Sequence, residues 1–159
     1  MRKHILVVMT AILVLALATA AIAADDPFVG TWKLNVTKSK LNGGPPPVRS
    51  QTTTFTIQDN GYKVVGDGVG PDGKSFHEVQ HLTNLDGKEH VVTGKPNQDA
   101  SINTKVDANT IIGIRKKDGK EVENISLVVS KDGKALTLTM KEKKPTGEDY
   151  ELCNVFDKQ

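Results

Sequence analysis

The sequence predicts an all-β fold, an up-and-down antiparallel meander closed into a β-barrel of about ten strands and preceded by a signal peptide. Three observations predict it. Short glycine-containing turns recur at intervals of roughly 12 residues, which is the spacing of an antiparallel meander. No sustained helical period follows residue 24. Apolar and polar residues alternate along the segments that flank the turns.

Most of the turns share the tripeptide Asp-Gly-Lys. Its copies are Asp72-Gly73-Lys74, Asp86-Gly87-Lys88, Asp118-Gly119-Lys120 and Asp132-Gly133-Lys134, and Asn60-Gly61 is a turn of the same kind. Asp-Gly and Asn-Gly favour two-residue hairpins because both central residues then need positive φ. Each turn offers one carboxylate, whereas a calcium loop needs several converging oxygens. We therefore interpret the repeats as turn chemistry.

Residues 1–23 are typical of a secretory signal peptide. A basic start at Arg2-Lys3-His4 precedes an apolar run over 5–18, and Ala21-Ile22-Ala23 supplies the small residues that precede cleavage. This predicts a secreted or periplasmic protein whose residues 24–159 form a single lipocalin-like β-barrel domain. The apolar run is short for a bilayer core of about 30 Å, so we expect no stable membrane insertion after cleavage.

Ten strands are expected after the signal peptide. Their approximate ranges are 28–36, 50–58, 62–69, 74–84, 89–93, 100–106, 110–117, 121–130, 135–141 and 149–156. The long connection 37–49 contains Pro45-Pro46-Pro47, which cannot continue a helix. We expect the proline loop, residues 42–48, to flank one opening of the barrel.

Two-residue turns fix the register of the flanking strands, so the turns can be tested against the side-chain pattern. The turn at 132–133 pairs Leu127 with Leu138 on an apolar face. By the same reasoning, Ile112 should lie opposite Ile125, and Ile57 opposite Val64. The agreement between turn chemistry and hydrophobic alternation predicts that these residues face one interior.

A barrel hides such an apolar face and also removes the exposed sheet edges. Ten strands enclose more space than eight, and only 4% of the residues are aromatic. The sequence therefore predicts a cavity that binds a small hydrophobic or amphipathic molecule. The expected lining residues are Phe55, Ile57, Val64, Ile112, Leu127, Leu138, Asn154 and Phe156. The alternative is a filled barrel with a structural or interaction role, whose partner would meet the face that carries Phe76, Leu82 and Val91.

The two terminal strands resemble those of the calycins, the superfamily of lipocalins and fatty-acid-binding proteins. The segment 28–34, with Gly30-x-Trp32 at its centre, is similar to the calycin first strand, and the segment 153–158 is similar to the closing strand of the fatty-acid-binding proteins. The resemblance implies a bacterial secreted lipocalin-like protein in which Gly30 and Trp32 close the barrel floor. It also implies an apolar ligand.

Two family features are not carried over. The Arg-x-Tyr pair that holds a carboxylate in the fatty-acid-binding proteins is replaced here by Asn154 and Phe156. Asn154 thus becomes the expected polar contact. Lipocalins often stack an arginine on the tryptophan, and Arg49 and Arg115 are the only arginines after residue 2.

The histidines leave two alternatives open. A two-residue turn at 86–87 would bring His81 and His90 diagonally together, and His77 would join them inside the barrel as a metal or haem site. The opposite face would then expose Phe76 and other apolar residues, and one bulge in the preceding strand would exchange the two faces. We therefore expect the histidine side chains to be hydrogen-bonded within the protein or exposed to solvent, and no cofactor is predicted.

Charge and cysteine content exclude several function classes. Removing Arg2 and Lys3 from the 21 basic residues leaves 19, which equals the 19 acidic residues, so no basic surface for nucleic acid is expected. The single cysteine, Cys153, allows no intramolecular disulfide. No nucleophile elbow or other catalytic constellation is present, so no enzyme is predicted.

Glu123 is expected at a strand rim, with a buried acid as the alternative. The sequence does not indicate an oligomeric state.

Overall fold

The computed structural model describes residues 26–42, 44, 46–143 and 148–159, and the expected signal peptide lies outside them. The described residues form strands joined by turns, with no helix. The strands are β1 Gly30–Leu34, β2 Lys40–Leu41, β3 Ser50–Gln58, β4 Gly61–Val69, β5 Ser75–Leu82, β6 Asp86–Val91, β7 Ala100–Lys105, β8 Thr110–Lys117, β9 Lys120–Val129, β10 Ala135–Lys143 and β11 Asp149–Lys158. Consequently, no helix in this part of the chain is long and apolar enough to cross a membrane.

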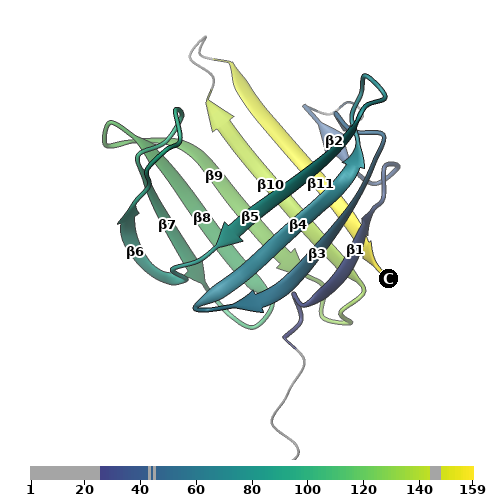
Figure 1. Cartoon of the computed structure of the whole chain (residues 1–159), viewed down its shortest axis with the longest axis horizontal. Coiled ribbons are helices and arrows are strands. Elements are labelled where there is room, and N and C mark those ends of the chain that lie inside the picture. The colour runs from purple at the N-terminus through teal and green to yellow at the C-terminus, as the bar shows by residue number, and fades with distance from the viewer. Residues whose placement is uncertain (1–25, 43, 45, 144–147) are drawn as a thin grey trace, which may run out of the picture.

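All strands belong to one antiparallel sheet, in the order β5-β4-β3-β1-β11-β10-β9-β8-β7-β6, with the short β2 added to β11. The predicted up-and-down meander is confirmed. Figure 1 shows a strongly curled sheet whose two ends are β5 and β6. The predicted closure is not formed, because no ladder joins β5 to β6 in the described residues. Two consecutive strands thus carry the free edges of the sheet.

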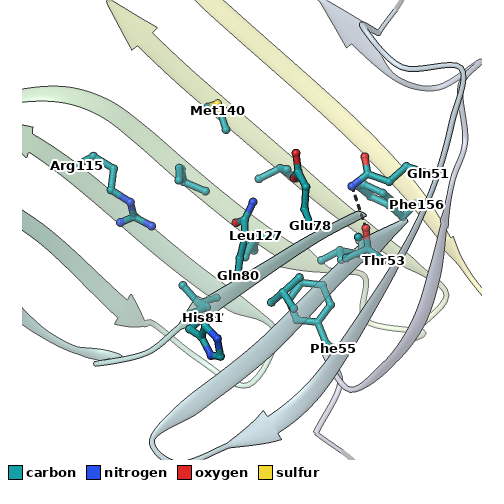
Figure 2. Close-up of a pocket in the computed structure, with 16 residues that line it drawn as sticks. Gln51, Thr53, Phe55, Glu78, Gln80, His81, Arg115, Leu127, Met140 and Phe156 are labelled. Carbon is teal, nitrogen blue, oxygen red and sulfur yellow. Dashed lines mark hydrogen bonds between the residues drawn. The ribbon is translucent and has the colours of Figure 1, made fainter. Parts of the chain in front are cut away.

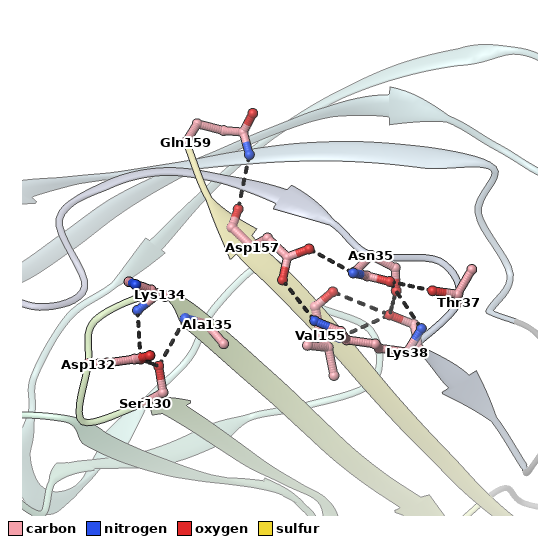
Figure 3. Close-up of polar contacts among 11 residues, drawn as sticks. Asn35, Thr37, Lys38, Ser130, Asp132, Lys134, Ala135, Val155, Asp157 and Gln159 are labelled. Carbon is pink, nitrogen blue, oxygen red and sulfur yellow. Dashed lines mark hydrogen bonds and ion pairs between the residues drawn. The ribbon is translucent and has the colours of Figure 1, made fainter.

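The hairpin at Asp132-Gly133 has the predicted register. Leu127 pairs with Leu138, although the loop spans four residues instead of two. The hydroxyl of Ser130 donates to Asp132 at 2.6 Å and shapes this loop (Figure 3). The loop is centred on the same two residues as the predicted turn, so the inward face of β9 and β10 is as predicted.

The turns at the start of the meander differ from the predicted ones. Between β3 and β4 the central residues are Asp59 and Asn60, so Ile57 pairs with Tyr62 instead of Val64. Between β4 and β5 the loop is one residue longer than predicted, because residue 70 pairs with residue 74. One extra residue exchanges the two faces of β5.

Asp86-Gly87 does not form a hairpin. Both residues belong to β6, where the pairing with β7 shifts between Asp86 and Glu89. Gly87 has φ of 73°, which suits a bulge that a residue with a Cβ would strain. The Asp-Gly pair thus bends an edge strand instead of joining two strands.

The apolar core fills one end of the curled sheet. Trp32 is fully buried, and its indole nitrogen donates to the carbonyl of Phe28 at 2.9 Å. The rings of Phe28, Phe55 and Tyr62 pack together with centroids 5.7–6.3 Å apart. Further buried residues from β1, β8, β9, β10 and β11 surround them. The other half of the interior is left without this filling.

The end of β1 is fastened to the last strand. The amide of Asn35 donates to Asp157 on β11 at 2.7 Å, and Lys38 donates to the same carboxylate (Figure 3). The Asn35 side-chain oxygen accepts from the hydroxyl of Thr37 at 2.8 Å. These bonds order the chain as it leaves β1 and hold the first and last strands together.

Gly68→Ala should destabilise the fold, since a Cβ there would lie 2.4 Å from the carbonyl oxygen of Ser50 and 2.6 Å from the ring of Phe76. We expect a loss of about 1–3 kcal/mol in urea unfolding, as for other overpacked sites. Gly66→Ala is the matched control two residues away, because its Cβ would meet only the end of the flexible Gln51 side chain, at 3.3 Å. Equal losses in both variants would contradict this packing.

Candidate functional site

A cavity of about 190 Å³ lies within the curled sheet, beside the apolar core (Figure 2). Its walls come from β3, β4 and β5 on one side and from β8, β9, β10 and β11 on the other. The lining residues are Gln51, Thr53, Phe55, Val64, Gly66, Glu78, Gln80, His81, Leu82, Arg115, Ile125, Leu127, Leu136, Leu138, Met140 and Phe156. Most of the wall is apolar, and a few polar groups are set into it.

Arg115 carries the only basic guanidinium in this wall. Figure 2 shows its side chain reaching in from β8, on the side of the cavity away from Thr53 and Phe156. Its Nη1 donates to Asn103 Oδ1 at 2.8 Å and to the carbonyl of Ile114 at 3.3 Å. Burial lowers the pKa of Arg115, although the group stays protonated at neutral pH. The cavity therefore holds a partly desolvated positive charge.

Glu123 is the register partner of Arg115 on β9, and Glu78 of β5 lines the same cavity as Arg115. Burial raises the pKa of Glu123, the guanidinium of Arg115 opposes this rise, and the neighbouring Glu142 adds to it. The two side chains interact through space, but no ion pair within 4.0 Å involves Arg115 in the described residues. Glu123 is half-buried near the start of β9, so it lies between the two alternatives of a rim carboxylate and a buried acid.

A β-bulge turns Arg115 inward. The hairpin at Asp118-Gly119 has the predicted two-residue turn, with φ of 51° and 73°. The register then shifts by one residue: Lys116 pairs with Glu121, whereas Arg115 pairs with Glu123. The one extra residue on β9 exchanges the faces of β8 from that point onward.

Because of this bulge, the expectation that Ile112 lines the interior is wrong. Ile112 pairs with Ser126 instead of Ile125 and is 41% exposed on the outer face. Its neighbour Ile111 takes the interior position and is 1% exposed. The sequence runs Ile-Ile-Gly-Ile at this point, so hydrophobicity alone does not distinguish the two faces.

Five of the expected lining residues lie on the cavity wall: Phe55, Val64, Leu127, Leu138 and Phe156. Their contact with a ligand stays a prediction. Ile57 is not on this wall, because it stands at the end of β3 and is 67% exposed. Asn154 does not line this wall either: it is buried beside its register partner Leu138, on the inward face that it shares with Phe156, and its Oδ1 has no hydrogen-bond partner among the described residues.

The histidines do not gather in the interior. The longer loop before β5 directs Phe76, Glu78, Gln80 and Leu82 inward. His77 lies on the other face and bonds to Asp67 at 2.7 Å, and His90 bonds to Asp86 on β6 at 2.9 Å. His81 is exposed and borders the cavity from the margin of β5. The alternative of three inward histidines is therefore wrong, and the described residues contain no group of metal-ligating side chains.

The partner face proposed for a filled barrel is also not formed. Phe76 and Leu82 are half-buried toward the interior, and Leu82 packs against the core, whereas Val91 is 84% exposed on β6. The three residues do not share a surface, because the same loop that exchanged the faces of β5 separates them. Exposed hydrophobic residues elsewhere are scattered singly, which is normal for a protein surface.

Gly30 and Trp32 lie on β1, and the closing role that the resemblance implies for them stays a prediction. A lysine, and not an arginine, covers the tryptophan: Lys158 Nζ lies 4.9 Å from the centroid of the Trp32 ring. Gly30 has φ of 131° and gives the stem of Lys158 room, since a Cβ there would lie 3.2 Å from it. Arg115, the remaining candidate for this stacking, lies in the cavity instead.

A second hollow, of about 220 Å³, lies beside the core and has a different chemistry. Lys105 Nζ donates to Asp26 Oδ2 and to the Tyr62 hydroxyl, both at 2.7 Å, and this hydroxyl donates to Asp26 at 2.6 Å. Burial raises the pKa of Asp26, but the bonds from Lys105 and Tyr62 outweigh it and bring the pKa below its ordinary value. These groups satisfy one another, so they fasten the N-terminal segment to the sheet.

Comparisons with known proteins were made at the level of families, sequences and structures. No family model matches this chain, and no curated protein matches its sequence. Among solved structures, it is similar to the zebrafish ileal bile acid-binding protein complexed with cholic acid, with 13% identity, a TM-score of 0.48 and coverage of 84% of this chain and 99% of that chain.

It is also similar to As-p18, described as an extracellular fatty acid binding protein, with 15% identity, a TM-score of 0.47 and coverage of 84% of this chain and 97% of that chain. The narrower expectation of a bacterial secreted lipocalin-like protein stays a prediction.

Asp26→Asn should cost about 1.5–3 kcal/mol of stability at pH 7, since it weakens hydrogen bonds to a charged acceptor. Because the folded state lowers the pKa of Asp26, its ionised carboxylate stabilises the fold at pH values above the unfolded-state pKa of about 4. This stabilisation is lost as the pH falls through the lower pKa of the folded state. Urea unfolding at pH 7 and pH 3 should therefore show the variant converging on the wild type in acid. The exposed Asp59→Asn is the control, and a constant difference at both pH values would contradict the role of Asp26.

Proposed function

We propose that this protein binds a small amphipathic molecule with an acidic group inside the curled sheet. The acidic group pairs with the guanidinium of Arg115, and the apolar part packs against Leu127, Leu138 and Phe156. A binding role fits the composition of the wall, which is mostly apolar with a few polar groups that fix orientation.

The observation that carries this proposal is the incomplete set of partners around Arg115. Within the described part of the chain, only Nη1 of the guanidinium has hydrogen-bond acceptors, and no carboxylate is within ion-pair distance. Arg115 is half-buried, so water hydrates its remaining donors when no ligand is bound, and a ligand can displace this water. An acidic ligand would supply the missing partner through a charge-assisted, bidentate contact.

The dimensions restrict the ligand. The cavity is smaller than the roughly 300–1,000 Å³ of sites for drug-sized molecules. It exceeds the roughly 150 Å³ that holds a single benzene-sized guest. We therefore propose a ligand of up to three rings or a short alkyl chain, part of which can extend past the free edges of the sheet. No residue of β6 or β7 lines the cavity, so the wall is thinnest toward the free edges of the sheet.

Two dyes that differ by one charged group test this proposal. Anilinonaphthalene sulfonate and the uncharged N-phenylnaphthylamine share an apolar scaffold, and both fluoresce on entering an apolar cavity. Arg115→Gln should weaken binding of the sulfonate by about 10- to 100-fold, the loss expected for a hydrogen-bonded charge pair of about 1.5–3 kcal/mol. Binding of the uncharged dye should change less than about threefold. Equal effects on the two dyes would contradict the pairing.

Filling the cavity is a separate test of its location. Leu138→Trp places an indole in the space between the walls and should abolish fluorescence enhancement by both dyes. Ile112→Trp adds the same side chain on the outer face of β8, two strands away, and should leave binding unchanged. Unaltered binding in Leu138→Trp, confirmed as folded by its unfolding midpoint, would show that the dyes bind elsewhere.

We also propose that the chain is exported, on the strength of the pattern in residues 1–23 alone. Expression of the whole chain in a bacterial host should yield a periplasmic protein whose first residue is Ala24. Leu13→Arg interrupts the apolar run and should retain the uncleaved chain in the cytoplasm. A wild-type chain that keeps Met1 and stays cytoplasmic would overturn the proposal.

A further inference from the structure

Asn103 joins the cavity to a distant part of the sheet. It lies on β7, is 6% exposed, and uses both ends of its amide. Its Oδ1 accepts the bond from Arg115 Nη1 at 2.8 Å, and its Nδ2 donates to the carbonyl of Thr83 at 3.0 Å. Thr83 belongs to the connection 83–85 between β5 and β6, the strands with free edges. One buried side chain therefore touches both the guanidinium and this connection.

Gly113 gives this contact its space. It is the register partner of Asn103 and lies two residues before Arg115 on the same inward face. A Cβ at this position would lie 3.0 Å from Arg115 Nη1 and 3.0 Å from Asn103 Oδ1. A larger residue would thus separate the two groups. The backbone of Gly113 has no positive φ, so the absent side chain, and not backbone freedom, is what the contact requires.

The contact also orients the guanidinium. Both hydrogen bonds of Arg115 use Nη1, so in the described residues Nε and Nη2 have no acceptor. These two nitrogens form one edge of the planar group and can bind a carboxylate or sulfonate bidentately. Asn103 thus binds Nη1 and leaves the edge formed by Nε and Nη2 available for the acidic group of the ligand.

We propose that Asn103 is a positioning residue that holds the Arg115 guanidinium for the acidic group of the ligand and links it to the connection between β5 and β6. This rests on the proposed function. A ligand on Nε and Nη2 restricts the guanidinium, and the restriction passes through the Asn103 amide to Thr83. Ligand binding and the order of residues 83–85 are therefore coupled, and the coupling acts equally in both directions.

Two variants test the positioning with the sulfonate and uncharged dyes. Asn103→Ala should weaken binding of the sulfonate about tenfold and that of the uncharged dye less than about threefold. Gly113→Ala removes no polar group and displaces only the ends of the Arg115 and Asn103 side chains, so it should show the same selective loss even if Asn103→Ala is poorly folded. Asn124→Ala, an exposed asparagine on β9, is the matched control and should have no effect.

A double-mutant cycle and hydrogen exchange complete the experiment. Combining Asn103→Ala with Arg115→Gln should weaken sulfonate binding no further than Arg115→Gln alone, within about threefold, because both act through one guanidinium. The sulfonate should slow amide exchange in residues 83–85 of the wild type, and this protection should be lost in Asn103→Ala and Gly113→Ala.

The outcomes separate the two proposals. Losses that multiply in the double variant, or ligand protection of 83–85 that persists in both single variants, would overturn the role of Asn103 while leaving binding at Arg115 intact. Equal weakening of both dyes by Asn103→Ala and Gly113→Ala would reduce Asn103 to a structural residue. Sulfonate binding that does not depend on Arg115 would overturn both proposals.

Discussion

The register of β8 against β9 decides what the cavity contains. Side chains alternate along a strand, so the one-residue bulge beside Arg115 selects which set of β8 residues faces inward. With regular pairing, Ile112 would face the cavity and the guanidinium would point into solvent. With the bulge, the guanidinium enters an apolar wall and the isoleucine faces outward. The wall therefore owes its charge to a single extra residue on β9, and its apolar character to the regular pairing of β9 with β10.

Lys105 and Arg115 differ in how many hydrogen-bonding and oppositely charged groups surround them. Lys105 is surrounded by Asp26, Tyr62 and the ring of Phe28, and this arrangement leaves little for a ligand to add. Arg115 has one amide, one carbonyl and a more distant Glu123. The first arrangement fastens the N-terminal segment to the sheet, whereas the second leaves hydrogen-bond donors of Arg115 available at the cavity wall. This difference in partners is the physical basis for assigning structure to one site and binding to the other.

Much of the fold could be predicted from the sequence, because turn chemistry and alternation agree over β9 and β10. The rest depends on loop lengths that Asp-Gly alone does not specify. The Asp-Gly pair at 118–119 forms a two-residue turn, and the pair at 132–133 lies in a four-residue loop. The pair at 72–73 follows a proline in a loop that is one residue longer than predicted, and the pair at 86–87 lies in a bulge of β6. Each added residue exchanges two faces, which is why Ile112 faces outward instead of inward and the alternative of inward histidines is wrong, whereas Leu127 and Leu138 face inward as predicted. Arg115 was missed for the same reason, and its rarity in the sequence was the only signal that could have pointed to it.

The central claim is that the Arg115 guanidinium is the point at which an acidic ligand binds inside the sheet. Nuclear magnetic resonance of protein labelled at the arginine side-chain nitrogens tests it directly, because residues 24–159 contain only Arg49 and Arg115. Titration with the sulfonate dye should shift the Nε signal of Arg115 and slow exchange of its proton, while the signal of Arg49, which bonds to the carbonyl of Pro71, stays in place. An Arg115 signal that does not move when the dye saturates the protein would contradict the account.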